Sequence, residues 1–156
     1  MSDPGQPLQK QKLSGVILAA GEGTRAYPYT QRIQKGMLDI CGRPLIRFAL
    51  EIMRDKLAIK FVVIVVSQDG NLIQEQLGDG SNLGVKITYV LNDAVHKGPV
   101  YSLSLVEPEI RTDRFVTMLS DEIYCGSNHE GLLDRKFEDD DIIITARPDS
   151  LIRDIR

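Results

Sequence analysis

The sequence lacks the features that mark a nucleic-acid-binding, membrane or secreted protein. Its 156 residues carry a formal net charge of −3, so no basic excess favours a nucleic acid or an anionic membrane surface as a partner. No apolar run approaches the roughly 20 residues of a transmembrane helix. The first residues are polar and have no apolar centre, unlike a secretory signal. We therefore expect a flexible tail over residues 1–13 and a cytoplasmic protein.

Reactive side chains are also sparse. The two cysteines, Cys41 and Cys125, have no CxxC spacing, which favours reduced, packed thiols over a disulfide or a zinc site. The P-loop pattern GxxxxGK[ST] is missing. No Ser/His/Asp or Cys/His constellation is recognisable, which is consistent with chemistry that needs no side-chain nucleophile.

The sequence does contain a regular alternation of strand and helix patterns. We expect strands at residues 16–20, 61–66, 85–91, 115–120 and 142–146. We expect helices at residues 45–53, 72–77, 100–106 and 128–137. The segment 61–66 is β-branched and apolar on both faces, as in a parallel strand covered by helices on both sides. This order predicts an α/β fold with a doubly wound, mostly parallel sheet in one domain over residues 14–156.

The first expected strand stops abruptly at a glycine loop, Gly21-Glu22-Gly23-Thr24-Arg25. A second cation, Lys35, follows ten residues later with a glycine beside it. Backbone amides without side chains and two cations near a strand end suit a triphosphate. A guanidinium such as that of Arg25 can grip phosphate oxygens in fork geometry.

Asp121 directly follows the apolar strand expected at residues 115–120. Its carboxylate should emerge at the sheet edge near the phosphates, where it would repel them unless a cation lies between. Magnesium binds in this way, with one or two carboxylates plus phosphate oxygens. The alternative is an aspartate that caps the next turn. Glu122 is a weaker candidate ligand because its side chain should point the other way.

A dinucleotide site is a competing interpretation of the same loop. Gly21, Gly23 and Ala26 satisfy the loose GxGxxA pattern. That pattern requires a helix that begins at the glycines, and Pro28, Thr30 and Gly36 make a long helix improbable there. The acidic residue nearest the required spacing is Asp39, which precedes another glycine instead of ending a strand.

Taken together, LAAGEGTRAYPYT, QKGML and GRPLI resemble the nucleotidyltransferases that join a nucleoside triphosphate to a phosphorylated sugar or alcohol. That family carries a pattern of the type LAAGxGTRxxPxTxxxPKxM. The resemblance implies a three-layer, Rossmann-like fold of the nucleotide-diphospho-sugar transferase type, Mg²⁺ as cofactor, and a nucleoside triphosphate and a phosphorylated acceptor as substrates. It leaves a homo-oligomer open.

The resemblance also implies roles for individual residues. Arg25 and Lys35 would neutralise the phosphates, and Asp121 would hold the metal ion. The nucleotide would contact the loop after the first strand, the glycine before the third helix, and Asn92 or Asp93. The nucleotide-binding residues implied in this way are Leu18, Ala19, Ala20, Gly21, Glu22, Gly23, Thr24, Asn92 and Gly98.

A narrower resemblance concerns the substrate. The segment HKGPVYSL is similar to cytidylyltransferases that act on phosphocholine or inositol phosphate, which implies CTP as the nucleotide.

The sequence departs from the usual pattern of the nucleotidyltransferase family at three points. Gln34 stands where the family usually has proline, Ser120 and Glu122 replace the commoner Gly and Asn around the aspartate, and the family's second metal-binding aspartate lies further downstream. We therefore expect residues 14–156 to be the nucleotide-binding part of a nucleotidyltransferase domain. If this chain is the entire polypeptide, the alternative function is a non-catalytic or regulatory nucleotide-binding module that lacks the acceptor half.

Overall fold

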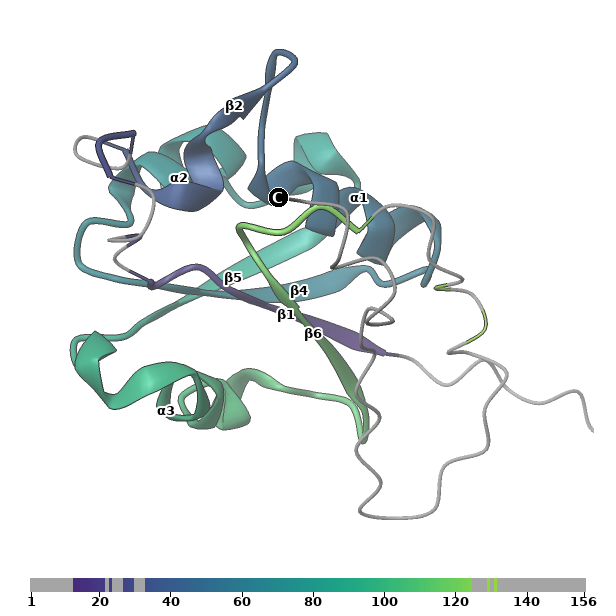
Figure 1. The fold of residues 1–156 in the computed structure, drawn as a ribbon. Helices are drawn as coiled ribbons and strands as arrows, with labels where there is room; N and C mark the ends of the chain where they lie inside the picture. The colour runs from purple at the N-terminus through teal and green to yellow at the C-terminus, as the bar shows by residue number, and fades with distance from the viewer. Residues whose placement is uncertain are drawn as a thin grey trace, which may run out of the picture.

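The computed structural model describes residues 13–21, 23, 27–29, 33–124, 129 and 131. A four-stranded parallel sheet in the order β5-β4-β1-β6 forms its centre. Helices α1 and α2 cover one face of the sheet and α3 covers the other (Figure 1). The expected three-layer α/β architecture is therefore confirmed. The elements of these layers are β1 (Ser14–Leu18), α1 (Ile46–Asp55), β4 (Phe61–Val66), α2 (Asn71–Leu77), β5 (Lys86–Leu91), α3 (Gly98–Ser104) and β6 (Phe115–Leu119).

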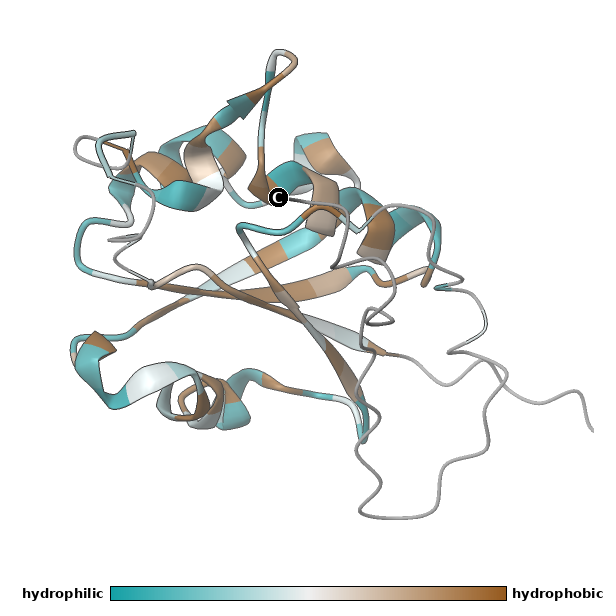
Figure 2. Cartoon of the chain, viewed as in Figure 1, coloured by the Kyte–Doolittle hydropathy of each residue, from teal (hydrophilic) through white to brown (hydrophobic). Residues whose placement is uncertain are grey.

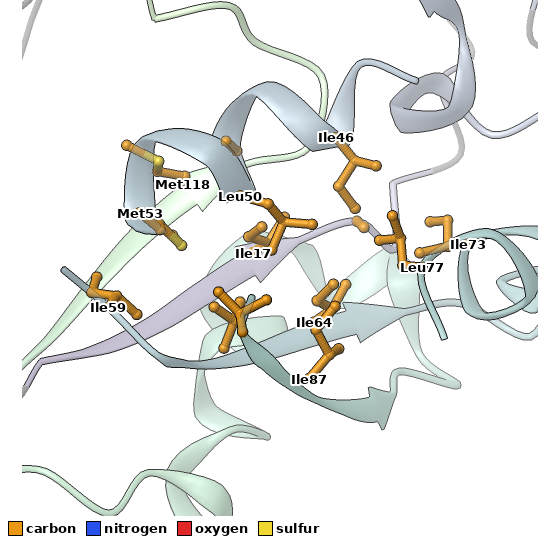
Figure 3. Close-up of a cluster of buried hydrophobic side chains, with 14 of the residues drawn as sticks. Ile17, Ile46, Leu50, Met53, Ile59, Ile64, Ile73, Leu77, Ile87 and Met118 are labelled. Carbon is orange, nitrogen blue, oxygen red and sulfur yellow. The ribbon is translucent and has the colours of Figure 1, made fainter. Parts of the chain in front are cut away.

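Alternate side chains of the central strands supply two separate cores, because successive residues of a strand point to opposite faces. Ile17 and Ile64 belong to the core on the side of α1, where Leu50 and Met53 also lie (Figure 3). Val16 and Val63 belong to a second, smaller core. All of these side chains are at most 3% exposed. Burial on both faces explains why β4 is apolar throughout, and the sheet is mostly hydrophobic in Figure 2.

The first strand begins and ends two residues earlier than expected. Ser14 belongs to it because it pairs with Phe115 of β6, and its hydroxyl and that of Thr112 form a 2.8 Å hydrogen bond, so a polar residue is satisfied at the start of a buried strand. Ala19 and Ala20 are buried but lie beyond the strand. An apolar run therefore did not distinguish the end of the strand from the buried turn that follows it.

A short hairpin was missed by the sequence analysis. Strands β2 (Asp39–Ile40) and β3 (Arg43–Pro44) pair antiparallel across a two-residue turn, whose residues Cys41 and Gly42 have φ values of 55° and 82°. Gly42 N donates to Asp39 Oδ1 at 2.9 Å, so Asp39 supports a turn. Cys41 is exposed at this turn, so the expectation of a packed thiol is wrong for this residue. The remaining short elements are the 3-10 helices η2 (Lys35–Met37), η3 (Ser81–Leu83), η4 (Val95–Lys97) and η5 (Glu107–Glu109).

Some expectations lie outside the described residues. They are residues 1–12 of the tail, nearly all of the helix at residues 128–137, and the strand at residues 142–146. Among the described residues, no helix has the length and apolar character required to cross a membrane.

Candidate functional site

The carboxyl ends of the parallel strands bring segments far apart in the sequence to one edge of the sheet. Ser120 N donates to Leu18 O at 3.2 Å, which joins the residue after β6 to the end of β1. Asn92 N donates to Val66 O at 2.8 Å and joins the residue after β5 to the end of β4. Ligands of open α/β sheets bind outside this edge, so the candidate site lies here.

The glycine loop leaves β1 at this edge. Gly21 is exposed, and a Cβ added to it would meet no atom within 4 Å, so its backbone can be approached closely. Gly23 has a φ of 65°, a conformation that L-residues with a side chain rarely adopt. Glu22, Thr24 and Arg25 lie outside the described residues, and their nucleotide-binding or catalytic roles remain predictions, as do those of Leu18, Ala19 and Ala20.

Two of the predicted site residues are in direct contact. Lys35 Nζ lies 2.5 Å from Asp121 Oδ2, although the residues are 86 positions apart in the sequence. Their side chains are 34% and 26% exposed, so the pair is half-buried and accessible from solvent. The site therefore places a cation and a carboxylate side by side at the end of β6, beside the segment that follows β1.

The loop that carries Lys35 is held against the sheet by its neighbours. Gln34 Nε2 donates to Ser67 Oγ at 3.0 Å, which ties the loop to the residue after β4. Met37 is 6% exposed and packs into the core on the side of α1. Gln34 replaces the family's usual proline, and its amide makes a hydrogen bond that a proline side chain cannot make. Lys35 is thus fixed on both sides within one turn of 3-10 helix.

Tyr124 is a neighbour of the site that the sequence analysis missed. Its hydroxyl oxygen accepts a hydrogen bond from Leu119 N at 2.9 Å, so the chain folds back over the end of β6. Burial raises the pKa of Tyr124 to about 12, and the negative charges of Glu122 and Asp121 act in the same direction. The tyrosine therefore stays neutral near pH 7. No periodicity or motif in the sequence indicated this contact.

The donor set at this edge suits a magnesium ion that arrives with phosphate. In the part of the chain that the structure describes, no group of three or more His, Cys, Asp or Glu side chains could hold a metal ion by itself. Asp121 supplies one accessible carboxylate. Mg²⁺ is commonly held by one or two carboxylates, water and substrate phosphates, so a single carboxylate fits an ion bound together with a nucleotide.

Asn92 has a structural role in this conformation. Its side chain is fully buried, its Nδ2 donates to Ser102 Oγ at 2.8 Å, and its Oδ1 accepts from Ala94 N at 2.8 Å. These bonds tie the loop after β5 to α3. Contact between Asn92 and a base stays a prediction that would require the side chain to leave these partners. Asp93 is exposed on the same loop.

Gly98 begins α3 with a φ of 84°, and a Cβ on it would meet no atom within 4 Å. The backbone there is open to a flat ligand, and a side chain would be strained by the positive φ rather than by contact. The position matches the expectation that Gly98 lets a base lie against the backbone, which remains a prediction.

A comparison with models of protein families shows to which family the chain is related. The family model described as nucleotidyl transferase matches residues 14–150. The chain belongs to the nucleotidyl transferase family. The match includes the glycine loop, Lys35 and Asp121, so the family suggested by the N-terminal motif is confirmed, and the dinucleotide interpretation loses its support.

Two similar nucleotidyltransferases are named for different nucleotides and for the same sugar phosphate. The chain is 30% identical over 116 residues to glucose-1-phosphate thymidylyltransferase of Neisseria meningitidis, and this match covers 74% of the chain and 40% of the relative. It is 35% identical over 127 residues to UTP–glucose-1-phosphate uridylyltransferase AglF of Haloferax volcanii, and this match covers 81% of the chain and 50% of the relative. The chain thus spans half or less of the length of these relatives.

A solved structure of a nucleotidyltransferase has a similar fold. The inositol-1-phosphate CTP transferase from T. maritima matches with a TM-score of 0.66 and 26% identity, over 86% of this chain and 52% of that one. The three proteins act, by their names, on different nucleotides and on a sugar or inositol phosphate.

Proposed function

We propose that the protein carrying this chain is a magnesium-dependent nucleotidyltransferase, which joins a nucleoside triphosphate to a phosphorylated sugar or alcohol and releases pyrophosphate. The observation that carries this proposal is the contact between Lys35 and Asp121 at the strand edge beside the glycine loop. A triphosphate needs cationic side chains, and its magnesium ion needs a carboxylate. The names of the relatives support the substrate class.

The reaction requires no nucleophile from the protein. A phosphate oxygen of the acceptor attacks the α-phosphorus of the triphosphate in line and forms a new P–O bond. The bond from the α-phosphorus to the oxygen that bridges it to the β-phosphorus breaks, and pyrophosphate leaves with that electron pair. A phosphate monoester is already anionic and nucleophilic at pH 7, so no general base is needed. The contribution of the protein is positioning and charge neutralisation.

The residues of the chain divide this work between them. Magnesium, when bound with the triphosphate, neutralises phosphate charge and orients the oxygens of the reaction. Asp121 would hold that ion through its carboxylate. Lys35 would donate from its ammonium group to phosphate oxygens, and Arg25, outside the described residues, would do the same from the glycine loop. The backbone at Gly21 and Gly98 would leave room for the nucleotide itself.

Two observations bear on which nucleotide and which phosphorylated acceptor the protein uses. The similarity of the segment that contains Tyr101-Ser102-Leu103 to cytidylyltransferases favours CTP with an inositol or choline phosphate. The curated relatives favour dTTP or UTP with glucose 1-phosphate. We place the protein in the cytoplasm, since a reducing compartment suits the exposed free thiol of Cys41.

A pyrophosphate-release assay tests the function. The protein at its natural full length is incubated with CTP, UTP, dTTP, GTP or ATP and with glucose 1-phosphate, inositol phosphate or phosphocholine, with Mg²⁺ or with a chelator. One triphosphate and one acceptor should together release pyrophosphate, and only when Mg²⁺ is present. No release from any pair in the presence of Mg²⁺, by a protein that is folded by circular dichroism, would overturn the proposal for these substrates.

A further inference from the structure

Gly36 lies in a contact that leaves no space for a side chain. It is buried in η2, between Lys35 and the core residue Met37. A Cβ on Gly36 would lie 2.9 Å from Ser120 Cβ, 3.0 Å from Ser120 Oγ and 3.3 Å from the carbonyl oxygen of Ser120. The distance to Ser120 Cβ is shorter than real Cβ contacts allow, so one of the two segments must shift, and the contact with Oγ is also tight.

Both segments are fixed, so this movement is costly. Ser120 is 6% exposed, and its amide donates to Leu18 O at the end of β1. On the other side, Met37 is anchored in the core and its amide donates to Gln34 O at 2.8 Å. Because Ser120 Cβ is attached directly to this fixed backbone, a rotamer change cannot remove it from the contact.

The contact lies next to the two charged residues of the site. Lys35 directly precedes Gly36, and Asp121 directly follows Ser120. The approach of the backbone at Gly36 to the side chain of Ser120 therefore joins the two segments beside the pair in which the Lys35 ammonium lies 2.5 Å from the Asp121 carboxylate. A shift between the two segments moves both charged groups together with their backbones.

We infer that Gly36 and Ser120 form a pair of positioning residues, in which the missing side chain of Gly36 accommodates the CH₂OH group of Ser120 and thereby fixes Lys35 against Asp121. This inference deepens the proposed function and rests on it. Neither residue is assigned contact with the substrate. Their effect on the reaction passes through the geometry of Lys35 and Asp121.

The test is a set of substitutions that add and remove single carbon atoms. Gly36→Ala should lower kcat by roughly 10- to 100-fold, the loss that a displacement of about 1 Å causes in positioned groups. Ser120→Gly removes the two atoms nearest to the added Cβ, and the next nearest is the carbonyl oxygen at 3.3 Å. The double variant Gly36→Ala, Ser120→Gly should therefore recover most of the lost kcat.

The matched control keeps the crowded atom. Ser120→Ala removes Oγ but retains Cβ, which is 2.9 Å from the added carbon. Gly36→Ala with Ser120→Ala should therefore stay as slow as Gly36→Ala alone, whereas a role of the Ser120 hydroxyl would give both double variants the same activity. All variants are assayed at a temperature at which circular dichroism shows them folded. If Gly36→Ala does not fold, folding and activity of the Gly36→Ala, Ser120→Gly variant become the decisive readout.

The outcomes separate this inference from the proposed function. Wild-type activity together with loss in Gly36→Ala and selective rescue by Ser120→Gly supports both. Wild-type activity with an unchanged kcat in Gly36→Ala, or without rescue, overturns the inference and leaves the function intact. A wild-type protein that is inactive with every substrate pair overturns the function and the inference with it.

Discussion

Replacement of Lys35 by methionine should change metal binding and nucleotide binding in opposite directions. The substitution keeps a long, flexible side chain and removes the ammonium that contacts Asp121 Oδ2. In the wild-type protein, a metal ion that binds without nucleotide competes with this ammonium for the Asp121 carboxylate. In Lys35→Met the carboxylate is available, so the metal ion alone should bind more tightly.

The magnitude follows from the exposure of the pair. The two side chains are about one-third and one-quarter exposed, so solvent screens their attraction, and such pairs typically contribute 0.2–1 kcal/mol. The affinity for the metal ion alone should therefore rise by roughly 1.4- to 5-fold. The affinity for the metal-bound triphosphate should fall, since a charge-assisted hydrogen bond worth about 1.5–3 kcal/mol is lost, which corresponds to roughly 10- to 150-fold.

Isothermal titration calorimetry with Mn²⁺, which accepts the same oxygen ligands as Mg²⁺, measures both quantities. Lys86→Met is the matched control, because Lys86 is an exposed lysine at the start of β5, at the opposite edge of the sheet. The control should bind Mn²⁺ and the Mn²⁺-triphosphate like the wild type. Equal or weaker Mn²⁺ binding by Lys35→Met would refute the competition between the ammonium and the metal ion.

Three further predictions concern the scaffold of the site. Asn92→Ala should lower the free energy of unfolding by about 1–3 kcal/mol, because Ala94 N and Ser102 Oγ lose their buried partner; an unchanged urea midpoint would contradict this. Burial raises the pKa of Tyr89 to about 12, so this residue stabilises the protein fully below pH 10, and its contribution declines as the pH rises toward 12. Tyr89→Phe should flatten this alkaline decline in a thermal unfolding series, and an equally steep decline would argue against it. Gly15→Ala should cost about 1–3 kcal/mol, since the added Cβ would lie 2.6 Å from Met53 Sδ, and calorimetry that finds equal stability would show that Met53 can move aside.

The sequence predicted the layers of the fold because their signal is local. The segment 61–66 had to be a strand buried on both faces, and β4 occupies these same residues. The hairpin of β2 and β3 gave no such signal, since two strands of two residues have no periodicity. Its turn places Cys41 at positive φ, a position where sequence patterns lead one to expect Asn, Asp or Gly.

The site was predicted in its parts but not in its contacts. Lys35 was assigned to the phosphates and Asp121 to the metal ion. Their direct contact depends on how a loop packs against a residue 86 positions away in the sequence. Asn92 was assigned to a base because the family resemblance implied that role. The structure satisfies its amide inside the protein, which depends on the distance to Ser102 and cannot be derived from a single sequence. Tyr124 reaches β6 by the same kind of packing.

The most direct test of the proposed function is the turnover of Asp121→Asn beside that of Asp113→Asn, measured as pyrophosphate release with Mg²⁺ and the preferred substrates. Both substitutions remove one negative charge, but Asp113 is exposed just before β6, at the opposite end of the strand from Asp121. Loss of the carboxylate at the site should lower turnover by about 2.7–4 kcal/mol in activation free energy, or roughly 100- to 1,000-fold, while Asp113→Asn retains wild-type turnover. Near-normal turnover of Asp121→Asn would contradict the assignment of the metal site and of the charge neutralisation that the proposed mechanism requires.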